Sequence, residues 1–595
     1  MNALIREIRP PGVYPASEEA RATPLSVADT RIAGFVGLAS KGPLDEPRRL
    51  SSWNEFVEIY GPSSEGYLAR AVEGFFLNGG KICYVVRIAH RPKQGELLGV
   101  EHASCAERIV KDGWDKPSLC VRALNEGRWG NAIWVRFSLN TSARTLLTLD
   151  LDVGAGEARV NSARGFERGA LIRIFDRENS DYIILTEVDD RTLRWSSSTP
   201  IVRRYRAAGP TYLEVLEFEV FASLKDRREV FRGLQLSPLS RRYVGRVVNE
   251  QSQLIRVEDL RSMSPSPHNL PLAAPAAKLT GGRDGSEAVT AEDFVGFDNG
   301  PAERRGLLSL SSVEQVAIMA VPDAMLSYQR HPGPQADRDV QRIQDAMVDV
   351  CEGLKDRFAI LDIPPTKDME AVKRWRRRVD SSFAAFYFPW LVVGGEGGGA
   401  GTSVPPSGHI AGIFARCDTQ HGSHKAPANE VINGISSLTL ALHDDHLGTL
   451  NAEGINTMRA FPGRGIRVWG ARTASDDPTW RYINVRRLFI MLRRSIVEGT
   501  HWVVFEPNNP NTWNVLSREI SSFLRIQWKK GAFAGQAAED AFYVKCDEET
   551  NPIGARDKGE MLVEIGVAPA LPAEFIIFTV VQNMGDQASD STPSA

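Results

Sequence analysis

Apolar runs and amphipathic stretches alternate in two parts of the chain. In the first hundred residues, the strand-like runs "RIAGFVGLA" and "KICYVVRIA" enclose two segments with helical spacing, "SWNEFVEIYG" and "GYLARAVEGFFLNGG". Ser51 or Ser52 would cap the first of these helices, and Gly61 would end it. From residue 313, strand patterns alternate with helix patterns again, as far as the strand-like run "FAAFYFPWLVV". This order predicts a parallel, doubly wound α/β sheet.

The pattern changes between about residues 96 and 245. Short alternating segments such as "ALIRIFD" and "DYIILTEVDD" are bounded there by Gly, Asp or Asn. Such spacing is typical of antiparallel strands. We therefore expect a β-rich unit inserted into the α/β layer.

The last third of the chain mixes strand and helix patterns. We expect a helix near "ISSLTLALHDDHL", strands at "IRVWGART" and "THWVVFEP", and long helices at "YINVRRLFIMLRRSIVEG" and "NTWNVLSREISSFLRIQWKKG". Together with the two preceding parts, this predicts a multidomain protein that combines α/β and α+β units.

The two ends of the chain have patterns of their own. Residues 1–30 are rich in Pro and small polar side chains, which favour an extended arm over a helix. Residues 574–582, "EFIIFTVVQ", place β-branched and aromatic side chains on both faces of a strand. Such a strand needs cover on both faces and partners on both edges. It is either a central strand of this chain's own sheet or a strand that pairs with another copy.

Composition and charge exclude several classes of function. A formal net charge of -3 over 595 residues offers no general attraction for nucleic acid or anionic membrane. No run reaches the roughly 18 apolar residues of a membrane span, and the start lacks the apolar core of a signal peptide. We therefore expect assembly in the cytoplasm and no direct membrane insertion. The six cysteines form no C-x-x-C pair, so we expect reduced thiols.

Three stretches contain residues that could carry chemistry, and none has a complete motif. His443 and His446 have metal-ligand spacing, with His421 and His424 upstream, but no H-E-x-x-H surrounds them. The glycines of residues 394–401 lack the Lys-Ser/Thr of a phosphate loop. Ser407 lies near His409 without an orienting acid. We expect no catalytic, cofactor or metal residues. The alternative is a cryptic hydrolase or metal-dependent enzyme on an α/β fold.

Basic residues gather on the last two predicted helices. Arg486, Arg487, Arg493 and Arg494 recur about one heptad apart on the first helix. Arg525, Lys529 and Lys530 lie near the end of the second, where cations also suit the helix dipole. These residues either form a patch that docks on an acidic protein surface or are a solvated face.

Several segments resemble the tail sheath proteins of contractile phages and related injection systems. The similarity lies in "PGVYPASEE", in "RIAGFVGLASKGPLDEPRRLSSWNEFVEIYG", in "FRGLQLSPLSRRYVGRVVNEQSQLIRV" and in the long block from "RYINVRRLFIMLRRSIVEG" to "KKGAFAG". The closing "LVEIGVAPALPAEFIIFTVVQ" is similar too, whereas the inserted unit is much less so.

The resemblance implies a helical homopolymer around an inner tube protein. It also implies baseplate and terminal cap partners, possible sheath paralogues, no cofactor and no nucleic acid. The central layer would be subtilisin-like but without a catalytic triad, and the particle would be a phage tail or a phage tail-like device. Terminal arms would add strands to neighbouring subunits, with hinges after Tyr14 and around Pro569 to Pro572. The strand-donation candidates are Val13, Tyr14, Phe575, Ile577, Phe578 and Val580. The inner-tube contact candidates are Arg525, Lys529 and Lys530.

The resemblance also divides the chain. We expect an N-terminal extended arm, a central α/β domain in two parts, an inserted β-rich outer domain, a C-terminal inner sheath domain, and a donated strand with a polar tail. In chain order these are 1–30 (arm), 31–95 (central, first part), 96–245 (insert), 246–400 (central, second part), 401–568 (inner domain) and 569–595 (strand and tail).

Overall fold

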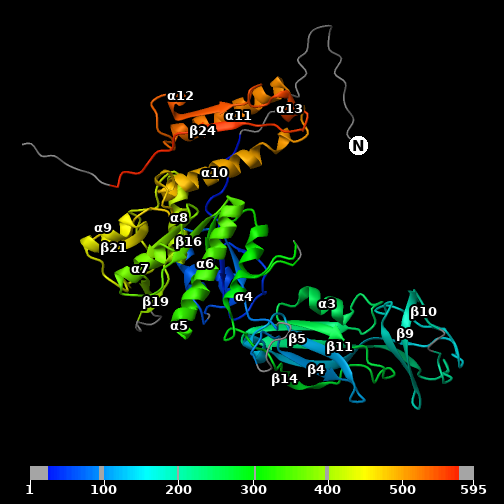
Figure 1. The fold of residues 1–595 in the computed structure, drawn as a ribbon. Helices are drawn as coiled ribbons and strands as arrows, with labels where there is room; N and C mark the ends of the chain where they lie inside the picture. Colours follow the sequence, from blue (N-terminus) through cyan, green and yellow to red (C-terminus); the bar gives the residue numbers. More distant parts are fainter. Residues whose placement is uncertain are drawn as a thin grey trace, which may run out of the picture.

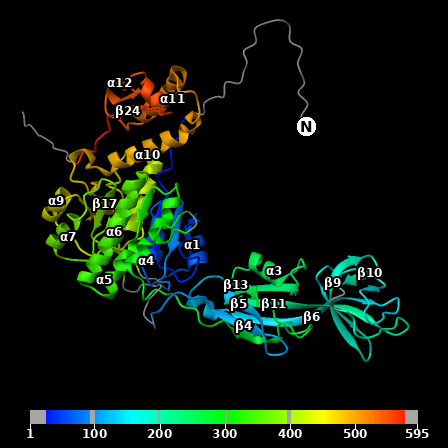
Figure 2. The same ribbon diagram turned by 45° about the vertical axis from the view of Figure 1, so that its right-hand side comes forward.

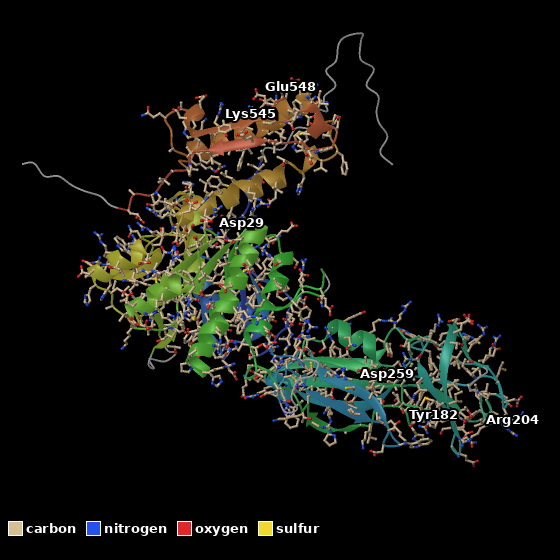
Figure 3. All side chains as sticks on the ribbon, in the orientation of Figure 1. Asp29, Tyr182, Arg204, Asp259, Lys545 and Glu548 are labelled. Carbon is tan, nitrogen blue, oxygen red and sulfur yellow. The ribbon has the colours of Figure 1, made fainter. Side chains whose placement is uncertain are left out.

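The chain folds into three bodies. The computed structural model describes residues 25–63, 65–92, 100–196, 200–300, 303–394 and 401–574. A central α/β body lies between a β-rich body at one side and a smaller C-terminal body at the other (Figures 1 and 2). Figure 3 shows Arg204 at the far end of the β-rich body and Lys545 on the C-terminal body. No helix within the described ranges has the length and apolarity to span a membrane.

The central body is built on an eight-stranded sheet. Its six inner strands are parallel, and one antiparallel strand closes each edge. The strands that follow the first strand in the sequence are added to the sheet on both sides of it. This arrangement confirms the predicted α/β layer. In spatial order the strands are β2 (Arg48–Leu50), β3 (Cys83–Arg87), β1 (Ala33–Gly37), β15 (Ile318–Ala320), β16 (Phe358–Asp362), β17 (Ala384–Phe388), β21 (Ile455–Phe461) and β22 (Gly465–Trp469).

The helices of the central body share one hydrophobic core with its sheet. As predicted, Ser52 caps the first helix by accepting a hydrogen bond from the Glu55 amide, and Gly61 ends it. Helices α2 and α8 approach closely, because a side chain at Gly412 would meet the Phe75 carbonyl oxygen 2.4 Å away. The helices are α1 (Trp53–Tyr60), α2 (Leu68–Leu77), α4 (Ala291–Val295), α5 (Leu326–Arg330), α6 (Pro334–Leu354), α7 (Met369–Arg376), α8 (Ser407–Gln420) and α9 (Asp444–Ala452).

Two elements of the central body differ from the sequence prediction. The run 383–393 is not one strand: β17 ends at Phe388, and β18 (Leu391–Val393) joins a separate small sheet with β19 (Thr402–Val404) and β20 (Ser437–Leu438). Pro389 has no N–H to continue the first ladder. The helix expected near 435–447 is also wrong in most of its length, since β20 occupies 437–438 and α9 begins only at Asp444.

The β-rich body contains two antiparallel sheets and two hydrophobic cores. Its pairing extends beyond the boundary predicted at residue 245, because β13 pairs with β5 and β14 pairs with β6. Helix α3 (Val244–Gln251) lies on this body as well. The strands are β4 (Glu107–Lys111), β5 (Pro117–Ala123), β6 (Trp134–Leu146), β7 (Glu157–Arg159), β8 (Leu171–Phe175), β9 (Ser180–Asp189), β10 (Thr192–Trp195), β11 (Tyr212–Leu224), β12 (Arg227–Leu234), β13 (Ile255–Asp259) and β14 (Ala274–Lys278).

The C-terminal body consists of two long helices and a short hairpin-like sheet. The helices α10 (Ile483–Gly499) and α11 (Pro510–Lys529) confirm the prediction. The strand expected at 500–507 is wrong: His501–Val503 form a 3-10 turn between the two helices, and Phe505 is fully exposed. The remaining elements are α12 (Ala538–Ala541), β23 (Phe542–Lys545), α13 (Ile553–Arg556) and β24 (Glu564–Val567).

Candidate assembly surface

The C-terminal body carries a sheet with two open edges. β23 and β24 pair antiparallel from Phe542 opposite Val567 to Lys545 opposite Glu564, and they cover α11. In the described ranges no third named strand joins this sheet. Alternate residues of an edge strand direct N–H and C=O groups away from the partner strand. Two strands alone are marginally stable in water, so this sheet is suited to accept further strands.

Beyond β24 the chain stays attached to the body. The Ala568 amide donates to the Ala541 carbonyl oxygen at 2.9 Å, and the Ala570 amide donates to the Ala532 carbonyl oxygen at 3.1 Å. These bonds extend the ladder of β24 by a few residues.

The N-terminal stretch 25–31 is fastened to α10. The Leu25 side chain lies against Gly499, and the Ala28 amide donates to the Ser495 hydroxyl at 2.9 Å. These two contacts fix the stretch to the last turns of the helix.

A buried ion pair completes this attachment. Arg487 donates two hydrogen bonds to the Asp418 carboxylate, at 2.8 and 2.6 Å, and each side chain is 2% exposed. The Thr30 hydroxyl donates to the same carboxylate at 2.5 Å, and Arg487 also donates to the Thr30 carbonyl oxygen. One carboxylate therefore joins α8, α10 and the start of the described chain.

The C-terminal stretch 570–574 is fastened as well. Arg472 donates to both oxygens of the Glu574 carboxylate, at 3.0 and 2.5 Å, with both side chains largely buried. The Asn484 amide group donates to the Ala570 carbonyl oxygen at 3.3 Å. Two residues at the expected hinge around Pro569 to Pro572, Ala570 and Glu574, are therefore held to the body within the described chain.

Most of the basic residues on α10 are internal, contrary to the expected patch. Arg487 and Arg494 are buried, and Arg486 lies over the Trp480 ring at 3.5 Å and the Phe383 ring at 4.2 Å. Of the four arginines, Arg493 is exposed. The heptad spacing marked the face that packs against the central body.

The basic residues at the end of α11 do lie at the surface. Arg525, Lys529 and Lys530 are exposed, and no ion pair holds them within the part of the chain that the structure describes. Arg518, which the sequence analysis missed, is also exposed, seven residues before Arg525 and eleven before Lys529. This spacing places the three side chains on one helix face, and the pattern was readable in the sequence.

The candidate chemical sites do not assemble. Ser407 begins α8 and donates its hydroxyl to Asp362 at 2.6 Å, while its amide donates to the same carboxylate at 2.9 Å. Burial raises the pKa of Asp362 to about 7. His409 is buried against Gly74, two residues along the helix and thus on a different face from Ser407. Burial lowers the pKa of His409 to about 4. The hydrogen bonds between Asp362 and Ser407 therefore join the end of β16 to the start of α8.

His443 and His446 lie at the exposed start of α9, with ring centroids 6.1 Å apart. No cluster of three or more metal-type ligands occurs in the described ranges. Residues 395–400 of the glycine stretch lie outside those ranges, as do Val13, Tyr14, Phe575, Ile577, Phe578 and Val580.

Two family models match consecutive parts of the chain. The phage tail sheath protein central domain matches residues 313–474, and the phage tail sheath C-terminal domain matches residues 475–583. The tail sheath protein of Vibrio phage KVP40 is 32% identical over 188 residues, 31% of this chain and 27% of that protein. A putative prophage major tail sheath protein of Pseudomonas aeruginosa is 24% identical over 48% of this chain and 70% of its own length.

Solved structures share the fold. The sheath tail protein of Listeria innocua has a TM-score of 0.53 at 12% identity, covering 92% of this chain and 96% of its own. The helical sheath of the anti-feeding prophage in its contracted state has a TM-score of 0.51 at 19% identity, covering 97% and 100%. At these identities the likeness concerns the fold. The two domain matches lead to one conclusion: residues 313–583 carry the central and C-terminal domains of the phage tail sheath family.

Proposed function

We propose that this chain is a structural subunit of a contractile sheath. The subunits polymerise helically around an inner tube, and contraction of the polymer drives the tube through a target envelope. The observation that carries the proposal, beside the family match, is the open-edged sheet of β23 and β24. The family match also supports a structural subunit rather than an enzyme.

The arms supply the missing strands. The N-terminal arm, through Val13 and Tyr14, and the C-terminal strand, through Phe575, Ile577, Phe578 and Val580, pair with the sheets of neighbouring copies. Main-chain hydrogen bonds give such pairing its affinity, and alternate side chains enter pockets of the acceptor. A head-to-tail contact of this kind builds an open filament rather than a closed ring.

The fastened roots of the arms explain how a lattice could contract without breaking. The Arg487–Asp418 pair and the Arg472–Glu574 pair hold residues 25–31 and 570–574 to each body. The paired arms stay connected while the bodies rotate as rigid units. No ATP is required, since better packing between bodies releases free energy.

The exposed cations of α11 hold the extended form on the tube. Arg525 and Lys529, with Arg518 beside them, form the positive stripe, and Lys530 follows at the helix end. An acidic tube surface would complement these charges. Baseplate and terminal cap proteins complete a phage tail or tail-like particle assembled in the cytoplasm, and the central layer is subtilisin-like without a triad.

A truncation series tests strand donation. A chain ending at Glu574 keeps every contact of the C-terminal stretch described above but lacks the donated strand. We expect the full chain to form long tubes by negative-stain microscopy and the chain ending at Glu574 to form none. The matched control ends at Gln582, which keeps the strand and loses only the polar tail. Long tubes from the chain ending at Glu574 would rule out strand donation.

Charge reversal tests the tube contact. Arg525→Glu with Lys529→Glu should block assembly of the extended form on purified tubes while tube-free contracted polymers still form. Lys558→Glu, an exposed lysine on the same body, is the control and should leave loading on tubes unchanged. Equal loading by both variants would remove the α11 stripe from the mechanism.

A further inference from the structure

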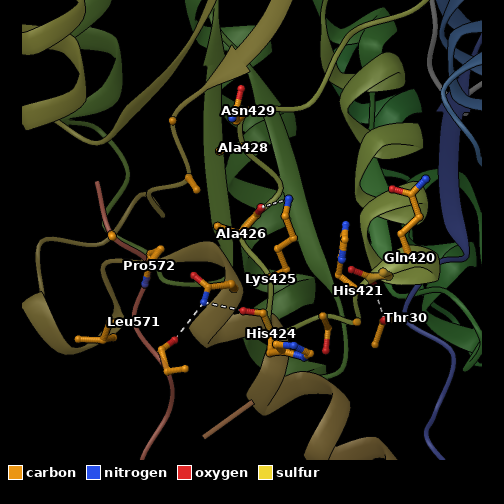
Figure 4. A pocket seen from close by; sticks show the side chains of 18 of the residues that line it. Thr30, Gln420, His421, His424, Lys425, Ala426, Ala428, Asn429, Leu571 and Pro572 are labelled. Carbon is orange, nitrogen blue, oxygen red and sulfur yellow. Dashed lines mark hydrogen bonds between the residues drawn. The ribbon is translucent and has the colours of Figure 1, made fainter. Parts of the chain in front are cut away.

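A large cleft lies where the two fastened stretches, 25–31 and 570–574, come together. Its volume is about 1570 Å³, and it is lined by residues 27–31, the loop after α8, parts of α9 and α10, the end of α11, and residues 570–574. Figure 4 shows His421 and His424 on the loop after α8, with Thr30 at one side and Leu571 and Pro572 at the other. The β23–β24 sheet is separate from this cleft but continues directly into its wall.

The carboxylates of the cleft are already paired with arginines. Asp29 binds Arg31 at 2.8 Å, and Asp444 binds Arg459 at 2.8 Å. Asp418 and Glu574 are held by Arg487 and Arg472 in the buried pairs described above. None of these four carboxylates is left to balance another cation.

Three other basic groups of the cleft have no carboxylate partner in the described part of the chain. They are His421, His424 and Lys530. Burial lowers the pKa of the His424 imidazole, and nearby His421 and Lys530 lower it further, against an opposing effect of Asp418. The unpaired positive charge of the cleft is therefore that of the Lys530 ammonium, which attracts an anionic group.

Several residues that line the cleft also carry a buried polar atom with no hydrogen-bond partner within the described ranges. They are Ser423 Oγ, Asn451 Oδ1, Asn484 Oδ1 and Gln527 Nε2. Ser423, Asn484 and Gln527 are each at least 95% buried. An unmade bond at a buried polar atom costs about 1–3 kcal/mol, and such atoms in native proteins normally have partners. Both donors and acceptors are unmet, which suits a polypeptide better than a simple anion.

We propose that this cleft binds the acidic tail of a neighbouring copy, residues 583–595, "NMGDQASDSTPSA". This segment contains Asp586 and Asp590 and no Lys or Arg, and its other side chains are mostly small or polar. Residues 1–24, the terminal segment outside the described residues at the other end, contain three Arg and three Glu and offer no net negative charge. Charge complementarity therefore selects the C-terminal tail.

The tail reaches a neighbour's cleft because it directly follows the donated strand in the chain. This step rests on the proposed strand donation, which carries residues 575–582 onto the acceptor sheet of another copy. On that copy, residues 568–574 lead from β24 into the cleft wall. Thirteen extended residues span about 40 Å, enough to follow this connection. The tail then acts as a second attachment beyond the donated strand, raising the effective concentration of the arm at its acceptor.

Photo-crosslinking in the full chain tests the tail site. A benzoylphenylalanine replaces Ser591 in one preparation and Thr579 in another, and each is mixed with isotopically labelled copies before assembly. We expect the probe at 591 to crosslink to residues 421–425 and 527–530 of a different copy. Lys530→Gln should reduce this yield about fivefold by removing a charge-assisted contact. Lys558→Gln, at an exposed lysine outside the cleft lining, should leave the yield unchanged.

The two probes separate this inference from strand donation. Crosslinks from 579 to β23 or β24 of a neighbour, without crosslinks from 591 to the cleft, would overturn the tail site and leave strand donation standing. Crosslinks from 591 to the cleft of the same copy would overturn the assignment to a neighbour. An equal loss of yield in the Lys558→Gln and Lys530→Gln variants would also overturn the tail site, since of these two lysines Lys530 lines it.

Discussion

Replacing Asp418 by Asn should release the N-terminal stretch from α10. The Asp418 carboxylate accepts two hydrogen bonds from Arg487 and one from Thr30, and its side chain is 2% exposed. Asn keeps the shape of Asp but cannot balance the guanidinium charge. Arg487 would then be a buried charge without a counter-ion, in contact with the ring of Phe414 at 4.6 Å.

The size of the effect follows from this burial. Removing one partner of a buried ion pair costs about 3–5 kcal/mol, and each 1.36 kcal/mol is a factor of ten in an equilibrium. Opening of the stretch should therefore become about two to four orders of magnitude more frequent. Most of this cost falls on residues 25–31, because Thr30 binds both members of the pair.

The Ala28 amide offers a local readout. It donates to the Ser495 hydroxyl at 2.9 Å and is buried, so its hydrogen exchange reports opening of the stretch. In the full chain at pH 7, exchange at Ala28 should be at least about a hundredfold faster in Asp418→Asn than in the parent protein. This measurement does not require the three bodies to unfold together.

Two further variants decide whether the reasoning holds. Asp444→Asn removes an ion pair whose carboxylate is 77% exposed, so exchange at Ala28 should stay close to that of the parent. Adding Arg487→Met to Asp418→Asn removes the uncompensated charge and should restore part of the protection. An acceleration below tenfold in Asp418→Asn, or an equal one in Asp444→Asn, would refute the role of the buried pair.

Two other changes have definite expected outcomes. Gly499→Ala would place a Cβ 2.0 Å from the Leu25 side chain, which must then leave its pocket at a cost of about 1.5–3 kcal/mol. Gly448→Ala, in an open position on α9, should instead stabilise the protein by up to about 1 kcal/mol. Thermal unfolding distinguishes the two variants, and equal melting temperatures would contradict the packing of Leu25. The pKa of Asp362 is about 7 in the folded chain against about 3.9 when unfolded, so the folded state binds the extra proton between these values. The contribution of Asp362 to stability is present below pH 4 and is lost as the pH rises through 7. The free energy of unfolding then falls by as much as about 4 kcal/mol. Asp362→Asn should flatten the dependence of urea unfolding on pH between about 4 and 7, and an unchanged slope would disprove that origin.

Elements governed by local interactions were predictable. The ends of α1 at Ser52 and Gly61 follow from capping, which involves residues three or four apart. Helices α10 and α11 have a long helical period of apolar residues and were predicted nearly to their ends. The exposed basic end of α11 was also foreseen, because charged side chains off the apolar stripe face solvent.

Elements that depend on distant partners were not. The segment 500–507 has high β-propensity, yet no strand lies beside it in the described structure, and it forms a turn. β-propensity expresses packing against neighbouring strands more than a preference of the backbone. Likewise, the arginines of α10 were read as a surface patch because nothing in the sequence shows that Phe383, Trp480 and Asp418 lie against them.

The sequence by itself determined the family resemblance, the alternation of α/β and β-rich parts, and the two long C-terminal helices. These properties follow from periodicity and from long ordered blocks of similarity. Only the tertiary structure decided that residues 25–31 and 570–574 are fastened beside α10 and that a cleft lies between them. The pairs responsible, Arg487 with Asp418 and Arg472 with Glu574, are 69 and 102 residues apart. Their energy arises from burial and geometry that exist only in the folded chain, so no local pattern in the sequence predicts these pairs.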